Sequence, residues 1–238
     1  MVNFLRYSKI FRLYETLQPF LKYSLPVEEG LPGKNILVIA PHPDDEAIGC
    51  AGAVRKHILA GKRADIVFCT MDTEVRRTES RFATALTGFA DSEYFDYPVE
   101  SLARQKDLPA RLGALCELKK PDIIFLPFYL DNHVDHRAVN AALATMAERT
   151  SFDCMVYAYP VWFPLYPNVV IDIGARWKEK KKIIECYASQ LATRDYVCMS
   201  HSLGQYWAQV KGHGLSVVET FFRASLPTYA ALVRKMLS

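Results

Sequence analysis

The 238-residue sequence lacks several patterns that mark particular protein classes. Its six cysteines include no CxxC pair, which argues against a disulfide framework and against a cysteine-based zinc site. No apolar run reaches the roughly 18–20 residues that a membrane span requires. A secretory signal is not recognisable either, so we expect reduced thiols and a cytoplasmic location.

Excess charge is also missing, because the net charge is only +3 at neutral pH. The first 27 residues account for all of it, and the remaining residues balance. We therefore expect no nucleic-acid interface on the main body of the protein. What the sequence does have is a hydrophobic fraction of 50%, which is ample for a packed core.

The N-terminal residues differ from the rest. Residues 1–18 show an amphipathic helical pattern with an aromatic stripe, and Pro19 and Pro26 follow it. We treat residues 1–30 as an extension and residues 31–238 as the main domain. The helix could pack on its own domain or on a partner subunit. Alternatively, residues 1–27 could form a basic aromatic helix that makes peripheral contact with the cytosolic face of a membrane.

From residue 35 onward, short apolar runs alternate with helical patterns. Such alternation predicts βαβ units and hence a Rossmann-like three-layer α/β/α fold with a mostly parallel sheet, whose active site lies at the carboxyl edge of the strands. The expected strands are 35–40, 64–69, 93–97, 122–128, 154–159, 169–173 and 217–223. The expected helices are about 47–60, 76–88, 135–148 and 175–187 and one at the C-terminus, and a helical region broken at Pro109 is expected over 100–119. The lysines of the helix 175–187 are expected to be solvated.

The first chemically informative segment is residues 35–46. Its apolar run ends abruptly in His42, Asp44, Asp45 and Glu46. Interspersed prolines prevent the strand from continuing, so the polar cluster must lie on a loop just past the carboxyl end of the strand. Open α/β sheets bind their ligands at this edge.

A second polar cluster, residues 131–136, follows the apolar strand 122–128 in the same way. If the two strands are neighbours, His42, Asp45 and one of the later histidines can converge as two nitrogen ligands and one oxygen ligand. This set suits a catalytic zinc with an open fourth position, although iron or cobalt would also be accepted. Water can bind at the open coordination position and be activated there, so the site predicts a hydrolytic enzyme.

The remaining polar groups can supply acid and base chemistry. Asp44 could accept a proton from the attacking water. His133, held as an imidazolium by the carboxylate of Asp135, could stabilise the developing oxyanion and protonate a leaving amine. Glu46 is either a favourable charge in the first turn of a helix or a support for the metal ligands.

These motifs resemble the PIG-L/LmbE-like zinc-dependent N-deacetylases, whose signature is a strand ending in (A/P)HPDDE and a later HxDH. Both motifs are present, at residues 41–46 and 133–136. Weaker similarities are an arginine and a glutamate at 76 and 79, the segment 187–190 and the segment 219–221. The resemblance extends over roughly residues 35–223.

The resemblance implies that His42, Asp45 and His136 bind zinc, that Asp44 is the general base and that His133 is its electrostatic and acid partner. It also implies that Arg76 contacts the substrate, although an ion pair of Arg76 with Glu79 on one helix face is an alternative.

Family members typically release acetate from N-acetylglucosamine in a glycoconjugate. We therefore expect a zinc-dependent N-deacetylase that acts on such an amino sugar. Two alternatives are cleavage of a non-sugar N-acyl compound and a non-catalytic docking protein with a structural zinc. The sequence carries no signal for an oligomeric state.

Overall fold

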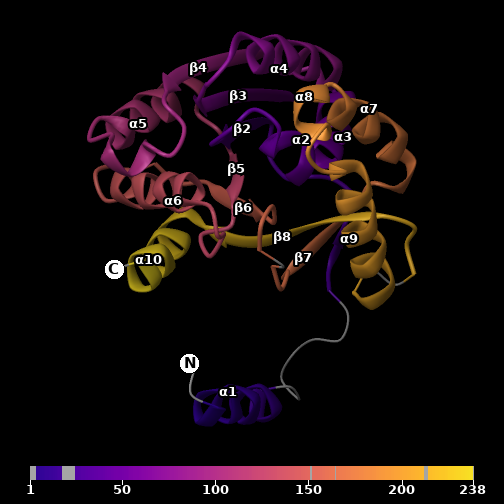
Figure 1. The fold of residues 1–238 in the computed structure, drawn as a ribbon. Coiled ribbons are helices and arrows are strands. Elements are labelled where there is room, and N and C mark those ends of the chain that lie inside the picture. The colour runs from indigo at the N-terminus through magenta and orange to yellow at the C-terminus, as the bar shows by residue number, and fades with distance from the viewer. Residues whose placement is uncertain (1–3, 18–24, 151, 164, 212–213, 238) are drawn as a thin grey trace.

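The computed structural model describes residues 4–17, 25–150, 152–163, 165–211 and 214–237 (Figure 1). Eight strands form one sheet in the order β1-β7-β8-β6-β5-β2-β3-β4. Strand β8 runs antiparallel to both of its neighbours, and the other described pairs are parallel. The strands are β1 (Val27–Glu28), β2 (Asn35–Ala40), β3 (Arg63–Thr70), β4 (Asp91–Tyr97), β5 (Ile123–Pro127), β6 (Met155–Tyr159), β7 (Val169–Asp172) and β8 (Val218–Ser225).

Helices cover both faces of this sheet, which confirms the predicted three-layer, mostly parallel architecture (Figure 1). One face carries α5 (Leu108–Lys119), α6 (Val134–Ala147) and α10 (Leu226–Leu237). The other carries α2 (Asp45–Gly49), α3 (Ala51–Leu59), α4 (Glu74–Thr87), α7 (Trp177–Glu185), α8 (Ala188–Leu191) and α9 (Tyr196–Val210). Short 3-10 turns lie at Leu102–Arg104 and Gly174–Arg176, and helix α1 spans Phe4–Leu17.

Strand β2 is buried on both faces, which explains its continuous apolar sequence. Leu37 and Ile39 pack into the core beneath α5 and α6. Ile36 and Val38 point the opposite way, into the core beneath α3. The strand therefore lies in the interior of the domain and holds the following loop in a fixed position.

The chain reverses its direction of travel across the sheet at β2. Strands β3 and β4 extend the sheet on one side of β2, and the chain then returns to place β5 on the other side, with Ile36 aligned to both Ala64 and Ile123. Open α/β sheets bind ligands at such a switch point. The carboxyl ends of β2 and β5 are neighbours, as the convergence of the two polar clusters requires.

The helices on the face of the sheet that carries α3 and α7 differ from the prediction in two ways. The expected helix 47–60 is broken at Cys50, because the carboxylate of Glu219 accepts hydrogen bonds from the backbone N–H groups of Gly52 and Ala53 at 2.8 and 2.7 Å and so caps a new helix. Lys180 is not solvated but buried, and its Nζ lies 2.6 Å from the same glutamate. The prediction also missed β1, α8 and α9.

Helix α1 presents exposed apolar side chains at Leu13, Tyr14 and Leu17. Residues 18–24, including Pro19, lie outside the described part of the chain. Among the residues that are described, no helix combines the length and apolarity needed to cross a bilayer. Contact of this helix with a membrane or a partner stays a prediction.

Candidate metal and catalytic site

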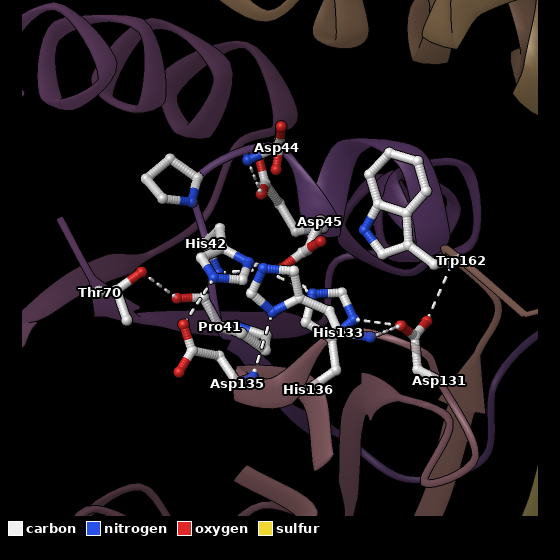
Figure 2. Close-up of polar contacts among 12 residues, drawn as sticks. Pro41, His42, Asp44, Asp45, Thr70, Asp131, His133, Asp135, His136 and Trp162 are labelled. Atoms are coloured by element: carbon white, nitrogen blue, oxygen red, sulfur yellow. Dashed lines mark hydrogen bonds and ion pairs between the residues drawn. The ribbon is translucent and has the colours of Figure 1, made fainter. Parts of the chain in front are cut away.

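Three side-chain atoms face one another at the carboxyl ends of β2 and β5 (Figure 2). Nδ1 of His42 and Nε2 of His136 lie 3.2 Å apart, and they lie 3.2 and 3.1 Å from Oδ2 of Asp45. Ligands at 2.0–2.1 Å from a tetrahedral zinc are separated by roughly 3.3–3.4 Å. This triangle of two nitrogens and one oxygen therefore fits one face of a tetrahedral metal site.

A carboxylate contacts the second ring nitrogen of both His42 and His136. Nε2 of His42 lies 3.0 Å from Oδ2 of Asp135, and Nδ1 of His136 lies 3.2 Å from Oδ1 of Asp131. Metal-binding histidines characteristically contact such a partner through the second ring nitrogen, because it fixes the ring orientation and the tautomer. The four residues thus form two carboxylate–histidine pairs directed at the same point.

The local charge favours a cation. Burial by itself lowers the pKa of His42, but its contacts with Asp135 and Asp45 outweigh this and raise the pKa to about 9. Burial would raise the pKa of Asp45, yet the two histidines hold it well below its usual range. The carboxylates at this point are matched by positive charge, which a divalent ion would supply directly.

His133 caps the N-terminus of α6, and the structure corrects its expected state. Its Nδ1 accepts a hydrogen bond from the backbone N–H of Asp135 at 3.1 Å, so the neutral ring carries its proton on Nε2. Burial also lowers the pKa of His133. The prediction of an imidazolium held by the Asp135 carboxylate is wrong. That carboxylate contacts His42 instead, and it accepts hydrogen bonds from the backbone N–H groups of Glu100 and Leu102.

The three histidines His42, His133 and His136 also form a group that could hold a metal, because their ring nitrogens lie within 4.8 Å of one another, so His133 is an alternative third ligand. The Nδ1 of His133 already accepts a hydrogen bond from the backbone N–H of Asp135, which leaves its Nε2–H as a hydrogen-bond donor at the edge of the candidate metal site.

Asp44 occupies a strained position beside the ligands. Its backbone φ of 121° is rare for a residue other than glycine. The conformation is held by its own N–H, which donates to Oε2 of Glu46 at 3.1 Å, and by Nη2 of Arg76, which lies 3.2 Å from its Oδ2. Burial raises the pKa of Asp44 to about 8, with a contribution from Asp45, whereas Arg76 lowers it.

Glu46 helps to hold the backbone of Asp44 in its conformation. It is almost completely buried, and its Oε1 accepts a hydrogen bond from the hydroxyl of Tyr187 at 2.5 Å. Glu46 lies in the first turn of α2, as one of the two predicted roles requires, and its carboxylate also joins the backbone of Asp44 to Tyr187, which follows α7. Burial raises its pKa to about 7.

Arg76 does not pair with Glu79 as the alternative proposed. Its Nη2 donates to the carbonyl of Pro43 at 2.6 Å as well as facing Asp44. The carboxylate of Glu79 instead accepts hydrogen bonds from the N–H and the hydroxyl of Ser189. Contact of Arg76 with substrate stays a prediction, and Arg76 does line the cavity at the site.

That cavity encloses about 460 Å³ including its open mouth. Its wall contains polar residues from both motifs and apolar residues from later segments. They are His42, Asp44, Asp45, Ile48, Arg76, Val99, His133, Val161, Trp162, Gln190 and Tyr196. The cavity is therefore lined by Asp44, the candidate base, by two of the candidate ligands and by His133, the candidate hydrogen-bond donor.

Asp131 is a supporting residue that the prediction did not assign, although it begins the second polar cluster. Its Oδ1 also accepts the N–H of His133 at 3.0 Å. We expect Asp131→Ala to weaken zinc affinity about 10–100-fold. Zinc titration with a competing chelator measures this, and the exposed Asp153→Ala is the matched control. Unchanged affinity in Asp131→Ala would contradict the assigned support.

Residues 37–147 match the model of one family, described as PIG-L: GlcNAc-PI de-N-acetylase. The PIG-L resemblance is confirmed. The matched segment contains every residue of the ligand triangle together with Asp44 and His133, whereas Trp162, Tyr187 and Tyr196 lie beyond it.

Individual PIG-L-like relatives are distant. A diacetylchitobiose deacetylase of Thermococcus kodakarensis is 22% identical over 215 residues, covering 76% of this chain and 80% of the relative. The conserved protein TT1542 from Thermus thermophilus has a TM-score of 0.70 at 23% identity, covering 80% of this chain and 94% of that one. An N,N'-diacetylchitobiose deacetylase from Pyrococcus horikoshii has a TM-score of 0.68 at 20% identity, covering 94% of both chains. At such identities the structural likeness shows the fold.

Proposed function

We propose that this protein is a metal-dependent hydrolase that removes the N-acetyl group from an N-acetylglucosamine-type sugar in a glycoconjugate. The observation that supports this most directly is the ligand triangle of His42, Asp45 and His136, which shares one cavity with the carboxylate of Asp44. A purely structural metal site has no use for a buried carboxylate beside an open coordination position.

The chain's own residues would divide the reaction as follows. When bound, zinc would polarise the acetyl carbonyl and lower the pKa of water. Asp44 accepts a proton from the water that attacks the carbonyl carbon. The Nε2–H of His133 donates to the oxygen on which negative charge develops. The amide C–N bond then breaks, the nitrogen takes up the proton held at Asp44, and acetate and the free amine leave.

The sugar part of the proposal is supported by the description of the family and by the names of the relatives, which act on acetylated amino sugars. Acetate release from a panel of N-acetylhexosamine conjugates and non-sugar N-acetyl amides would test it. Activity on the sugar conjugates is the expected result. Activity restricted to the non-sugar amides would overturn the sugar assignment and favour a general amidase.

Removal of the metal provides a separate prediction. Dialysis against a strong chelator is expected to abolish acetate release and to lower Tm, since an ion that binds only the folded state stabilises it. One equivalent of Zn²⁺ should restore both, and Co²⁺ or Fe²⁺ can be compared in the same assay. Elemental analysis gives the stoichiometry. Full activity in protein shown to be metal-free would contradict the proposed chemistry.

We further propose that residues 1–30 are an extension of the catalytic domain at 31–238, joined to its sheet through β1 at Val27–Glu28, and that α1 makes peripheral contact with the cytosolic face of a membrane. Its exposed Leu13, Tyr14 and Leu17, together with exposed Lys9 and Arg12, support an interfacial helix. Deletion of residues 1–17, which keeps the buried Leu25 and strand β1, is expected to reduce sedimentation with anionic liposomes and to leave deacetylation of a water-soluble substrate unchanged. Equal liposome binding by both proteins would contradict the membrane contact.

A further inference from the structure

Two aromatic side chains stand in the wall of the catalytic cavity without a role in the proposed chemistry. Trp162 follows β6, and Tyr196 is the first residue of α9. Their ring centroids lie 6.0 Å apart at an interplanar angle of 71°, an edge-to-face contact. The guanidinium carbon of Arg194 lies 5.0 Å from the centroid of the Trp162 ring. These contacts hold the indole in one orientation at the cavity wall.

The backbone of Trp162 is also tied to the metal ligands. Its N–H donates to Oδ2 of Asp131 at 2.9 Å, and Oδ1 of the same carboxylate contacts His136 Nδ1 and the N–H of His133 (Figure 2). The side-chain amide of Asn132 donates to the carbonyl of Trp162 at 3.3 Å. The buried Asp131 therefore connects the backbone of Trp162 to the histidines of the candidate metal site.

A pyranose ring has the shape and chemistry for this wall. One face of the ring is lined with C–H groups and can lie on an indole, while its hydroxyl groups point outward at the edges. Gln190 lines the same cavity and carries an amide that can donate to or accept from such hydroxyls. An acyclic N-acetyl amide offers no comparable flat apolar face.

We propose that Trp162 is the platform on which the sugar ring lies while its acetamido group is at the metal site, and that it makes the enzyme selective for pyranosides. This inference rests on the proposed deacetylase function. It adds a residue outside both polar motifs and outside the matched family segment.

The first test compares two substrates, methyl N-acetylglucosaminide and N-acetylethanolamine. For Trp162→Ala we expect kcat/KM on the glucosaminide to fall about tenfold or more, mainly through KM, because a ring-sized apolar contact is lost. The value on the acyclic amide should change less than about twofold, and Trp162→Phe should retain most of the sugar activity. A matched control is Trp177→Ala, because Trp177 stacks on His201 on another part of the surface. An equal loss on both substrates, or no loss on the sugar, would overturn the platform.

The second test measures binding without turnover. Chitobiose, which carries no acetyl group, is titrated into the holoprotein while tryptophan fluorescence is recorded. Wild type and Trp177→Phe should respond, and Trp162→Phe should not. If wild type binds chitobiose through Trp162 but releases no acetate from any conjugate, the platform stands and the deacetylase assignment fails. If sugars are deacetylated and the response survives in Trp162→Phe, the platform fails and the deacetylase assignment stands.

Discussion

Replacing Asp44 with Asn is expected to lower kcat about 10²–10⁴-fold while the protein keeps its metal, which is the range that a general base contributes. Asn removes the proton acceptor and preserves the shape of the side chain. Asn also tolerates a positive φ better than Ala does, so the φ of 121° at this position makes Asn the cleaner substitution. Acetate release and metal content are measured on the same sample.

Asp72→Asn is the matched control for this variant. Oδ2 of Asp72 lies 3.6 Å from Nη1 of Arg76, so it contacts the same arginine from a more exposed position. We expect it to retain most of the activity. If Asp44→Asn kept full activity, Asp44 would not be the base, and the proton acceptor would have to be sought elsewhere in the cavity.

Replacing His136 with Ala is expected to have the larger overall effect, because both the metal and the activity should be lost. The substitution removes one corner of the ligand triangle and leaves Asp45 and Asp131 without their common partner. Removing one partner of a buried polar contact destabilises the folded state, because the remaining group loses its partner without regaining water. We therefore expect a lower Tm in addition to a metal content near zero by elemental analysis.

The variant His201→Ala is the control, because it also removes a histidine but one that lies outside the candidate metal site. His201 stacks on Trp177 with ring centroids 4.3 Å apart and does not line the catalytic cavity. It should keep a full metal content. Retention of metal by His136→Ala would contradict our ligand set and would favour His133 as the third ligand, since its ring nitrogen belongs to the same group.

The position of the site followed from the sequence because its determinants are local. Each polar cluster directly follows an apolar strand, so the backbone must deliver both clusters to the same sheet edge. The structure supplied the remaining condition, which is that β2 and β5 are neighbours. The proposal of His136 as the third ligand came from the resemblance to a known family, since spacing alone left two histidines open.

Other features depend on residues far apart in the chain and carried no local signal. The carboxylate of Asp135 was assigned to its neighbour in sequence, His133, but it reaches back 93 residues to His42. Lys180 lies in a lysine-rich run, and only the position of Glu219 on β8 explains its burial. Helix α9 was not predicted, and it brings Tyr196 into the cavity.

The position of strand β8 in the sheet limits when the chain can fold during its synthesis. It lies between β6 and β7 in the sheet but follows both in the chain. A nascent chain that ends before residue 218 therefore has two separate sets of strands, and it lacks the glutamate that caps α3. We expect fragments restricted to residues 37–147 to be insoluble or unfolded even though they contain the whole ligand triangle. Fusion partners or cuts placed within residues 218–225 should have the same result.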